Sequence, residues 1–456
     1  MPKQWLYDQK LKILKGPCYK RSGGTLQTVS EEAIIAYANA VREVKDITND
    51  DDLYRTLRSS FGQDSVAHSL LQVTAKTHKP EFKFRAIHAQ PRSIFFPAMA
   101  WVRETLKTII RKTPCIMRDS AQMLQKLAHR KFARNVVFVK ADIADYFMSG
   151  HHREILECCA EAIVDPIDQR VFRTLAGFIL DHQIISVRES DAAWRVTIGS
   201  GMGLTCSGEI SDVAYHELVE RGQLDYITPE ITNRTGIQWY GRFKDDLLII
   251  FDDDRLKKVN TLRQIIGRGR FFKLKVEAMS SISCTMLDVH LWKGPRFEAT
   301  GRLDFRVFQK DTQIWEPLSP TSAHPQHVHM NWPKGMCKRF HRLCSQSSVA
   351  REVSRRFVAR LDLFTPERPR PDNRRPKPFS RLILPFHTMW TGLGAHSIIH
   401  DAAEEAGISH NIVANVAIGW KLSAKHVGQN IMSGNGFLHQ DCYGDPTRHS
   451  IWRLEG

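Results

Sequence analysis

The chain has 456 residues, of which 42% are hydrophobic and 25% charged, so it is long enough to bury several cores. This composition excludes wholesale disorder and fibrous repeats. No run approaches the roughly 20 apolar residues of a membrane-spanning helix, the nearest being residues 93–102 with Pro97 inside it. Lysines and an aspartate interrupt the first 16 residues, so we expect no signal peptide and an intracellular protein.

The charge balance points to a polyanionic partner. Lys and Arg total 65 against 49 Asp and Glu, a net charge of +16, which favours nucleic acid first and an anionic membrane second. A basic surface that only aids solubility is the alternative. The nine cysteines form no CxxC pair, which indicates reduced, mostly buried thiols rather than disulfides or a structural zinc site.

Periodicity predicts the following elements in chain order. Residues 1–60 are helical, with Thr28 as the expected N-cap and Glu31 closing a capping box. Between residues 136 and 293, short β-rich runs alternate with helical periods, which predicts an α/β segment built on one sheet. A run rich in Pro and Arg, residues 366–378, is typical of an extended linker.

Two places put carboxylates at strand ends. In VVFVKADIADYF a strand delivers Asp142 at its edge, and in WYGRFKDDLLIIF two apolar strands flank Asp245 and Asp246, which predicts a β-hairpin with both acids at its tip. Paired acids repel each other unless a cation lies between them, and Mg²⁺ takes one or two carboxylates plus substrate phosphates. If Asp142 comes alongside Asp245, the acids can hold two ions roughly 3.5–4 Å apart, as in a nucleotidyl-transfer site.

Each acidic motif alone is a weak signal, because a lone Asp after a strand is more often a turn residue or a helix cap. The two motifs lie about 100 residues apart with a Gly-rich loop between them, and this combination is more specific. In the loop sequence GSGMGLTCSGEISD, Gly199, Gly201 and Gly203 allow close backbone approach to a ligand. A helix beginning near Ser207 aims its N-terminus at negative charge, although a merely flexible turn is the alternative.

Two further features concern the substrate. Phe147, the fifth residue after Asp142, would overlap a ribose 2′-hydroxyl and exclude ribonucleotides, unless it is simply a core aromatic. Upstream, AKTHKPEFKFRAI predicts a β-ribbon that grips a triphosphate, unless it is only a solvated strand. The basic residues of this ribbon are Lys76, Lys79, Lys83 and Arg85.

Five motifs follow one another along the chain. They are a basic ribbon, DxxxxF, a Gly-rich loop, an [FY]xDD hairpin and a strand ending in LD. This order resembles that of reverse transcriptases, and the motifs are similar to those of Penelope-like retroelement reverse transcriptases. THKPEFKFRAI resembles that family's HKP…RPI, RDSAQMLQKL its Asp-Ser helix, GSGMG its G-T-A-M-G, WYGRFKDDLLII its W-x-R-[YF]-x-DD hairpin and MLDVHL its F-L-D-V strand. SAHPQHVHMNWP, RFHRLCS and LILPFH resemble later elements, so the resemblance spans about residues 64–428.

The resemblance implies an α+β right-hand polymerase, with an antiparallel palm sheet backed by helices and mostly helical N-terminal and thumb regions. Such an enzyme copies an RNA template into DNA from a DNA primer and deoxynucleoside triphosphates, with two Mg²⁺ ions for which Mn²⁺ can substitute. The implied site residues are the catalytic and metal-binding acids Asp142, Asp245 and Asp246, the triphosphate contacts Lys79 and Arg85, the sugar gate Phe147, and Met202 and Gly203 beside the template and incoming base. The implied regions are an N-terminal helical region 1–60, fingers 61–135, palm 136–295, a palm-to-thumb region 296–365, the linker 366–378 and a C-terminal thumb-like region 379–456.

The chain departs from the family pattern at two positions near the site. Lys244 replaces the usual apolar residue before the acid pair, and Gly208 stands where the family commonly has Pro. Both departures bear on rate and fidelity more than on reaction class. Nothing after Leu422 resembles the GIY-YIG endonuclease of full-length relatives, so we expect either a branch without the endonuclease or a truncated chain.

Two other functions stay open: an RNA-dependent RNA polymerase, and a catalytically inactive or domesticated copy that only binds nucleic acid. A cluster of His and Cys residues at 324–344 has no zinc-finger spacing, and its Cys337, His341 and Cys344 are expected on one buried helical face. The arginines of residues 366–378 favour a nuclear-import signal, which a solvated linker explains as well. We expect an intracellular, nuclear protein without a membrane partner.

Overall fold

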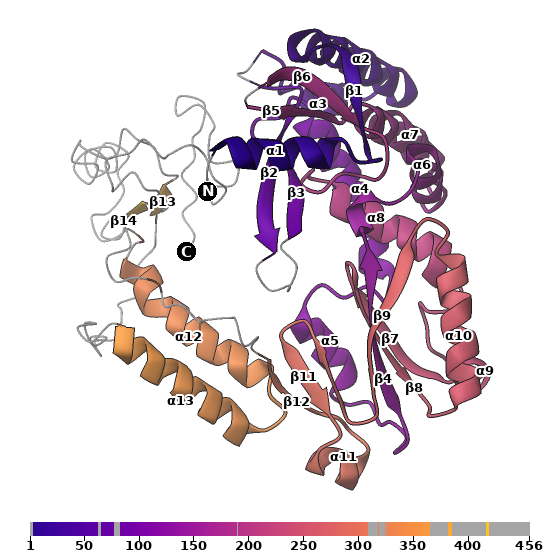
Figure 1. The fold of residues 1–456 in the computed structure, drawn as a ribbon, viewed down its shortest axis with the longest axis vertical. Coiled ribbons are helices and arrows are strands. Elements are labelled where there is room, and N and C mark those ends of the chain that lie inside the picture. Colours follow the sequence, from indigo (N-terminus) through magenta and orange to yellow (C-terminus); the bar gives the residue numbers. More distant parts are fainter. Residues whose placement is uncertain are drawn as a thin grey trace. The chain divides into compact units, whose positions relative to one another are not determined.

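The computed structural model describes residues 3–62, 65–76, 83–188, 190–308, 318, 324, 326–364, 382–384 and 416–418. The chain forms two compact units, Met1–Thr312 and Gln313–Gly456. Within its described residues, the first unit contains three sheets with helices around them (Figure 1). Nowhere in the described part is a helix both long enough and apolar enough to cross a membrane.

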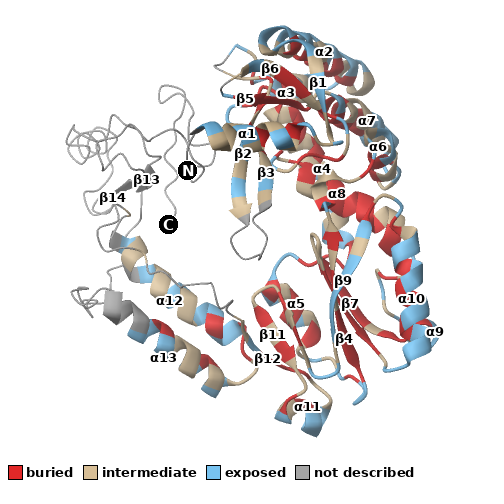
Figure 2. Cartoon of the chain, in the orientation of Figure 1, coloured by how far each residue is buried: buried red, intermediate tan, exposed pale blue. Residues whose placement is uncertain are grey.

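A four-stranded antiparallel sheet carries the acidic motifs. In spatial order its strands are β7 (Ile237–Phe243), β8 (Asp246–Phe251), β4 (Val137–Ala144) and β9 (Lys273–Ser280). On β4, Val139 and Ala141 belong to the main core, to which the helices α8 (Ser207–Tyr215) and α10 (Arg255–Arg268) also contribute. Most of β4, β7 and β8 is buried (Figure 2).

The opposite face of this sheet, here called the polar face, carries charged side chains. The strand register pairs Asp142 with Asp246 and Lys140 with Leu248. Successive side chains of a strand point to opposite faces, and directly paired residues of antiparallel strands share a face. Lys140, Asp142 and Asp246 therefore lie together, on the face opposite to Val139 and Ala141.

A second, five-stranded sheet has the order β1 (Tyr19–Thr25), β6 (Ser190–Val196), β5 (Ile184–Val187), β2 (Ser69–Lys76) and β3 (Lys83–Ala89). All its pairs are antiparallel except the parallel pair of β2 and β5. The strands β2 and β3 form the predicted basic ribbon, in which Arg85 lies opposite Thr74.

The prediction of one sheet over residues 136–293 is wrong. The strands β5 and β6 lie within that segment but pair with β1 and β2 from the N-terminal part of the chain. Short apolar runs reveal that a strand forms, but they do not reveal its partner. A third sheet holds the end of the segment, with antiparallel strands β10 (Ser283–Met286), β11 (Val289–Trp292) and β12 (Asp304–Val307).

The helix α5 (Ser120–Leu127) is the predicted Asp-Ser helix. Asp119 is its N-cap and accepts a hydrogen bond from the amide of Gln122 at 2.8 Å. The hydroxyl of Ser120 bonds to Asp288, which lies between β10 and β11, so α5 is attached to the third sheet. The short helix α11 (Pro295–Thr300) precedes β12.

The remaining helices of the first unit are α1 (Lys3–Leu14), α2 (Leu26–Thr48), α3 (Asp51–Arg58), α4 (Phe96–Lys112), α6 (His152–Glu161), α7 (Pro166–Asp181), α9 (Pro229–Thr235), the 3₁₀-helix η1 (Tyr146–Met148) and the π-helix η2 (His216–Glu220). The predicted N-cap of α2 is wrong. Thr25 is the cap and accepts from the amide of Thr28 at 3.2 Å, because the chain turns into the helix directly after β1. Glu31 closes no capping box and instead accepts from the side chain of Gln27 at 2.9 Å.

The second unit contains α12 (Gln326–Arg342), α13 (Ser347–Phe364) and the parallel pair β13 (Leu382–Leu384) and β14 (Val416–Ile418). Phe340 and Phe357 join the two helices, with ring centroids 5.4 Å apart. Since α12 ends at Arg342, Cys344 follows the helix and His341 is exposed, so the expected single helical face of Cys337, His341 and Cys344 is wrong.

The α+β class predicted from the sequence is confirmed, with helices packed on one face of an antiparallel sheet. The boundaries predicted within the first unit at residues 60, 135 and 295 stay predictions. The predicted linker 366–378 and nearly all of the region 379–456 lie outside the described residues.

Candidate active site

A cavity of about 1030 Å³ lies against the polar face of the four-stranded sheet. It brings together most of the site residues predicted from sequence, namely Arg85, Asp142, Phe147, Met202, Asp245 and Asp246. Gly203 is next to the lining residue Met202 in the Gly-rich loop, and Lys79 lies outside the described residues. Segments far apart in the sequence therefore meet at one cavity.

The three acids come from two adjacent strands and the turn between β7 and β8. Asp142 lies inside β4, which continues to Ala144, so its predicted place at the strand edge is wrong. Asp245 lies in the turn as predicted, whereas Asp246 is already the first residue of β8. The register places the α carbons of Asp142 and Asp246 about 4.5–5.5 Å apart. The amide of Ile143 donates to the carbonyl of Asp245 at 2.9 Å and ties the turn to β4.

Lys140 is a charged residue of the site that sequence reasoning missed. Its Nζ lies 3.6 Å from Oδ1 of Asp246 and 3.0 Å from Oε2 of Glu277 on β9. The sequence does contain a signal for this residue. A lysine interrupts the apolar run VVFVKA two residues before Asp142, and residues two apart on a strand share a face.

Burial raises the pKa of Asp246, and although Lys140 opposes this, the neighbouring carboxylates of Asp245 and Glu277 raise the pKa further. The repulsion between these carboxylates adds to the effect of burial, and a cation beside them would lower the pKa of Asp246 again. Within the described part of the chain, no three His, Cys, Asp or Glu side chains are grouped as a ready-made metal cage.

The Gly-rich loop connects the basic ribbon with the end of β4. The amides of Ser200 and Gly201 donate to the carbonyl of Phe147 at 2.9 and 3.2 Å, and the amide of His88 donates to the carbonyl of Met202 at 2.7 Å. A Cβ on Gly199, whose φ is +82°, would lie 2.4 Å from the carbonyl oxygen of Phe147. Glycine is therefore required there both for its φ and for the close approach. The helix after the loop, α8, begins at Ser207 as predicted.

Phe147 lies in η1 and is half-buried. Part of its ring packs on the main core, and the residue also lines the cavity. Its ring centroid is 5.2 Å from that of Tyr146 in an edge-on arrangement. Phe147 thus packs on the core and also lines the cavity, and its role as a sugar gate stays a prediction.

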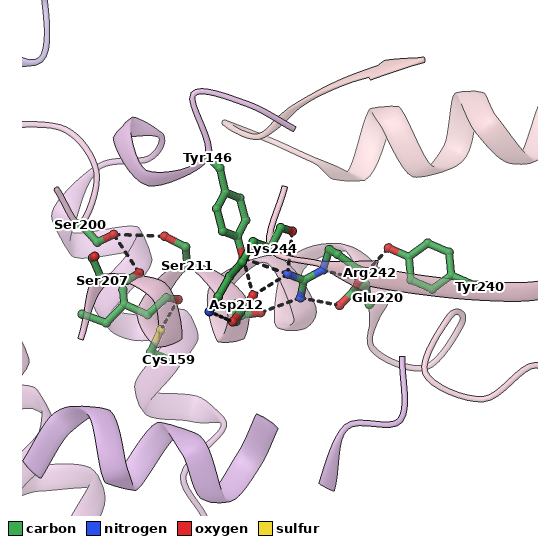
Figure 3. A network of polar contacts seen from close by, with 11 residues as sticks. Tyr146, Cys159, Ser200, Ser207, Ser211, Asp212, Glu220, Tyr240, Arg242 and Lys244 are labelled. Atoms are coloured by element: carbon green, nitrogen blue, oxygen red, sulfur yellow. Dashed lines mark hydrogen bonds and ion pairs between the residues drawn. The ribbon is translucent and has the colours of Figure 1, made fainter. Parts of the chain in front are cut away.

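A buried ionic network joins β7 to α8, η1 and η2 (Figure 3). Its centre is Arg242 of β7, whose side chain is 0% exposed. The guanidinium donates to Oδ1 of Asp212 at 2.7 Å and to the two carboxylate oxygens of Glu220 at 2.7 and 3.0 Å. Tyr146 and Tyr240 donate to the same carboxylates, each at 2.6 Å. The network links β7, α8, η1 and η2, and so it holds the elements that carry Asp245 and Phe147.

Sequence reasoning gave these residues no role. Arg242 lies within the hairpin motif, in the apolar run IQWYGRF. An arginine in such a run indicates a buried ion pair. Asp212 and Glu220 lie on a helical stretch among apolar residues, where buried carboxylates need cationic partners. Their pairing with Arg242 follows from the packing of α8 and η2 near β7, which the sequence does not show.

Comparison with known proteins gives a short family match and weak structural similarities. The sequence-family model described as "Animal helix-turn-helix domain" matches residues 317–358, which include α12 and part of α13. No curated protein is significantly similar to the chain.

The similar solved structures include a telomerase from Candida albicans in complex with a fragment of telomeric RNA (9% identity, 74% of this chain and 57% of that chain, TM-score 0.45). They also include the apo telomerase from Candida tropicalis, with 11% identity over 65% of this chain and 58% of that chain and a TM-score of 0.43. A third is the BmCPV RNA-dependent RNA polymerase at quiescent state, with 12% identity over 62% of this chain and 26% of that chain and a TM-score of 0.40. The chain thus spans 26–58% of the length of these proteins.

Proposed function

We propose that the chain is an RNA-directed DNA polymerase that extends a DNA primer along an RNA template. The observation that carries this proposal is the pairing of Asp142 with Asp246, beside Asp245, at a cavity that also contains Arg85 and Phe147. Nucleotidyl transfer needs acids that hold metal ions and cationic groups that bind the triphosphate in one place. The cavity combines such acids with the basic ribbon and an aromatic side chain.

Two Mg²⁺ ions, or Mn²⁺ as a substitute, fit the chemistry of these donors. Carboxylate oxygens are hard ligands, and Mg²⁺ binds one or two of them together with substrate phosphates. A cation beside the carboxylates would also relieve the repulsion from Asp245 and Glu277, which adds to the effect of burial on the pKa of Asp246. Asp142, Asp245 and Asp246 would hold the ions, which supply Lewis-acid activation of the primer 3′-hydroxyl and stabilise the leaving pyrophosphate.

The other residues bind and select the nucleotide. Arg85, with Lys79 as its predicted companion, offers the triphosphate a guanidinium fork and a point charge. Met202 and Gly203 contact the template and incoming base in this proposal, which the attachment of their loop to the ribbon at His88 supports. Phe147 lines the cavity where an incoming sugar would approach the acids, so it favours deoxyribose over ribose by overlap with the 2′-hydroxyl.

Primer extension on an RNA template with Mg²⁺ and deoxynucleotides tests the proposal. Asp245→Asn should lower the rate by at least about 100-fold, since loss of a direct ligand costs more than loss of an outer-shell partner. Its affinity for template-primer should stay near that of the parent. Asp191→Asn, an exposed aspartate on β6, is the matched control and should be as active as the parent.

The same assay separates the other two functions. A parent protein that uses ribonucleotides as well as deoxynucleotides is an RNA polymerase, and Phe147 is then not a sugar gate. A parent that binds template-primer without extending it is a nucleic-acid-binding protein. Equal activity of Asp245→Asn and the parent would refute the assignment of the acids.

A further inference from the structure

Lys244 occupies the turn between β7 and β8, directly before Asp245. Its φ is +53°, a left-handed conformation in which glycine or asparagine is far commoner than lysine. The backbone of the turn is already bonded, since Arg242 donates to the carbonyl of Lys244 at 3.2 Å and Ile143 donates to the carbonyl of Asp245 at 2.9 Å. The turn itself does not call for a lysine at this position, so we ask what the lysine side chain contacts.

The side chain of Lys244 extends to α8 and forms an ion pair with Oδ2 of Asp212, whose side chain is 3% exposed (Figure 3). The other oxygen of that carboxylate accepts from Arg242 at 2.7 Å and from Tyr146 at 2.6 Å. Lys244 is thus the residue of the turn whose side chain joins the hairpin to the helix that follows the Gly-rich loop.

Gly208 lies beside this contact. A Cβ at Gly208 would lie 2.9 Å from Nζ of Lys244, so the end of this flexible side chain would shift slightly to make room. Gly208 lies inside α8 without a positive φ, so its backbone conformation does not itself require glycine.

We propose that Lys244 is a positioning residue that orients Asp245 for metal binding by tethering the β7–β8 turn to α8. This inference rests on the proposed function in taking Asp245 as a metal ligand. When Lys244 is lost, Asp212 keeps Arg242 and Tyr146 as partners. The fold should survive while the turn loses one of its attachments.

The test titrates Mn²⁺ into the whole chain by calorimetry and compares the parent with Lys244→Met. Thermal unfolding and the Mg²⁺ dependence of primer extension are measured in parallel. The matched control is Lys257→Met, an exposed lysine on α10.

Lys244→Met should weaken Mn²⁺ binding and raise the half-saturating Mg²⁺ concentration on the order of tenfold, the lower end of the cost of changes outside the ligand set, with an unfolding temperature like that of Lys257→Met. Parent-like Mn²⁺ affinity in Lys244→Met overturns the proposal.

Failure of the proposed function gives a different result. If the parent binds Mn²⁺ but extends no primer, the polymerase assignment fails, and the calorimetry alone decides whether Lys244 positions Asp245. If the parent binds no Mn²⁺, both the metal site and the role of Lys244 are refuted.

Discussion

Replacing Arg242 by Met tests whether the buried network holds the candidate site in place. Methionine is of similar length but carries no charge and no donors. The change leaves Asp212 with Lys244 and Tyr146, and it removes the ion-pair partner of Glu220, whose side chain is 0% exposed. Removing one partner of a buried ion pair costs about 3–5 kcal/mol, because the remaining charge is left uncompensated away from water.

Urea unfolding followed by tryptophan fluorescence should show this loss in the free energy of unfolding of Arg242→Met. The midpoint of thermal unfolding should fall by roughly 5–8 °C, at about 1.5 °C per kcal/mol for the 312 residues of the first unit. Arg242→Lys keeps the charge without the guanidinium fork and should recover part of the loss. The control Arg263→Met, an exposed arginine on α10, should lie within about 0.5 kcal/mol of the parent. A value for Arg242→Met within about 1 kcal/mol of the parent would refute the reasoning.

Three further predictions concern selectivity, the Gly-rich loop and acid stability. Phe147→Ala should increase the use of ribonucleotides relative to deoxynucleotides on the order of 100-fold in primer extension, and an unchanged ratio would show that the ring is not a gate. Gly199→Ala should destabilise the protein and relax the same selectivity, because its Cβ would contact the carbonyl of Phe147; Gly222→Ala, which has φ +75° and open space, is the control for backbone strain alone, and equal effects of the two would contradict the contact. Burial raises the pKa of Asp212, but Arg242 and other partners outweigh it and hold the pKa below the usual 3.8, so this stabilisation is present above pH 3.8 and is lost as the pH falls through the folded pKa. Asp212→Asn should therefore flatten the fall of stability below about pH 4, and an acid limb as steep as that of the parent would contradict the assignment.

Local patterns in the sequence identified much of the site. The hairpin around Asp245, the helix beginning at Ser207 and the basic ribbon ending near Arg85 are each encoded within a short stretch, by strand propensity, glycines or alternation. The proximity of Asp142 to the hairpin was inferred from the kind of chemistry that such acids perform, and the strand register confirms their adjacency.

What the sequence could not show depends on long-range packing. The partner strands of β5 and β6 come from more than 100 residues upstream, so their separate sheet has no local signal. The pairing of Arg242 with Glu220 likewise requires η2 to lie against β7. The N-cap of α2 was misplaced because Thr25 and Thr28 are both suitable caps, and only the end of β1 decides between them.

The ladder between β4 and β8 limits where the chain can change in length. Because side chains alternate along each strand, a single inserted residue within 137–142 or 246–251 would rotate a carboxylate toward the helix-packed interior and carry apolar groups into the cavity. The exposed turn at Arg221 and Gly222, directly after η2, lies outside that ladder, so an insertion there leaves the pairing of the two aspartates untouched. Engineered tags or reporter domains therefore belong at this turn.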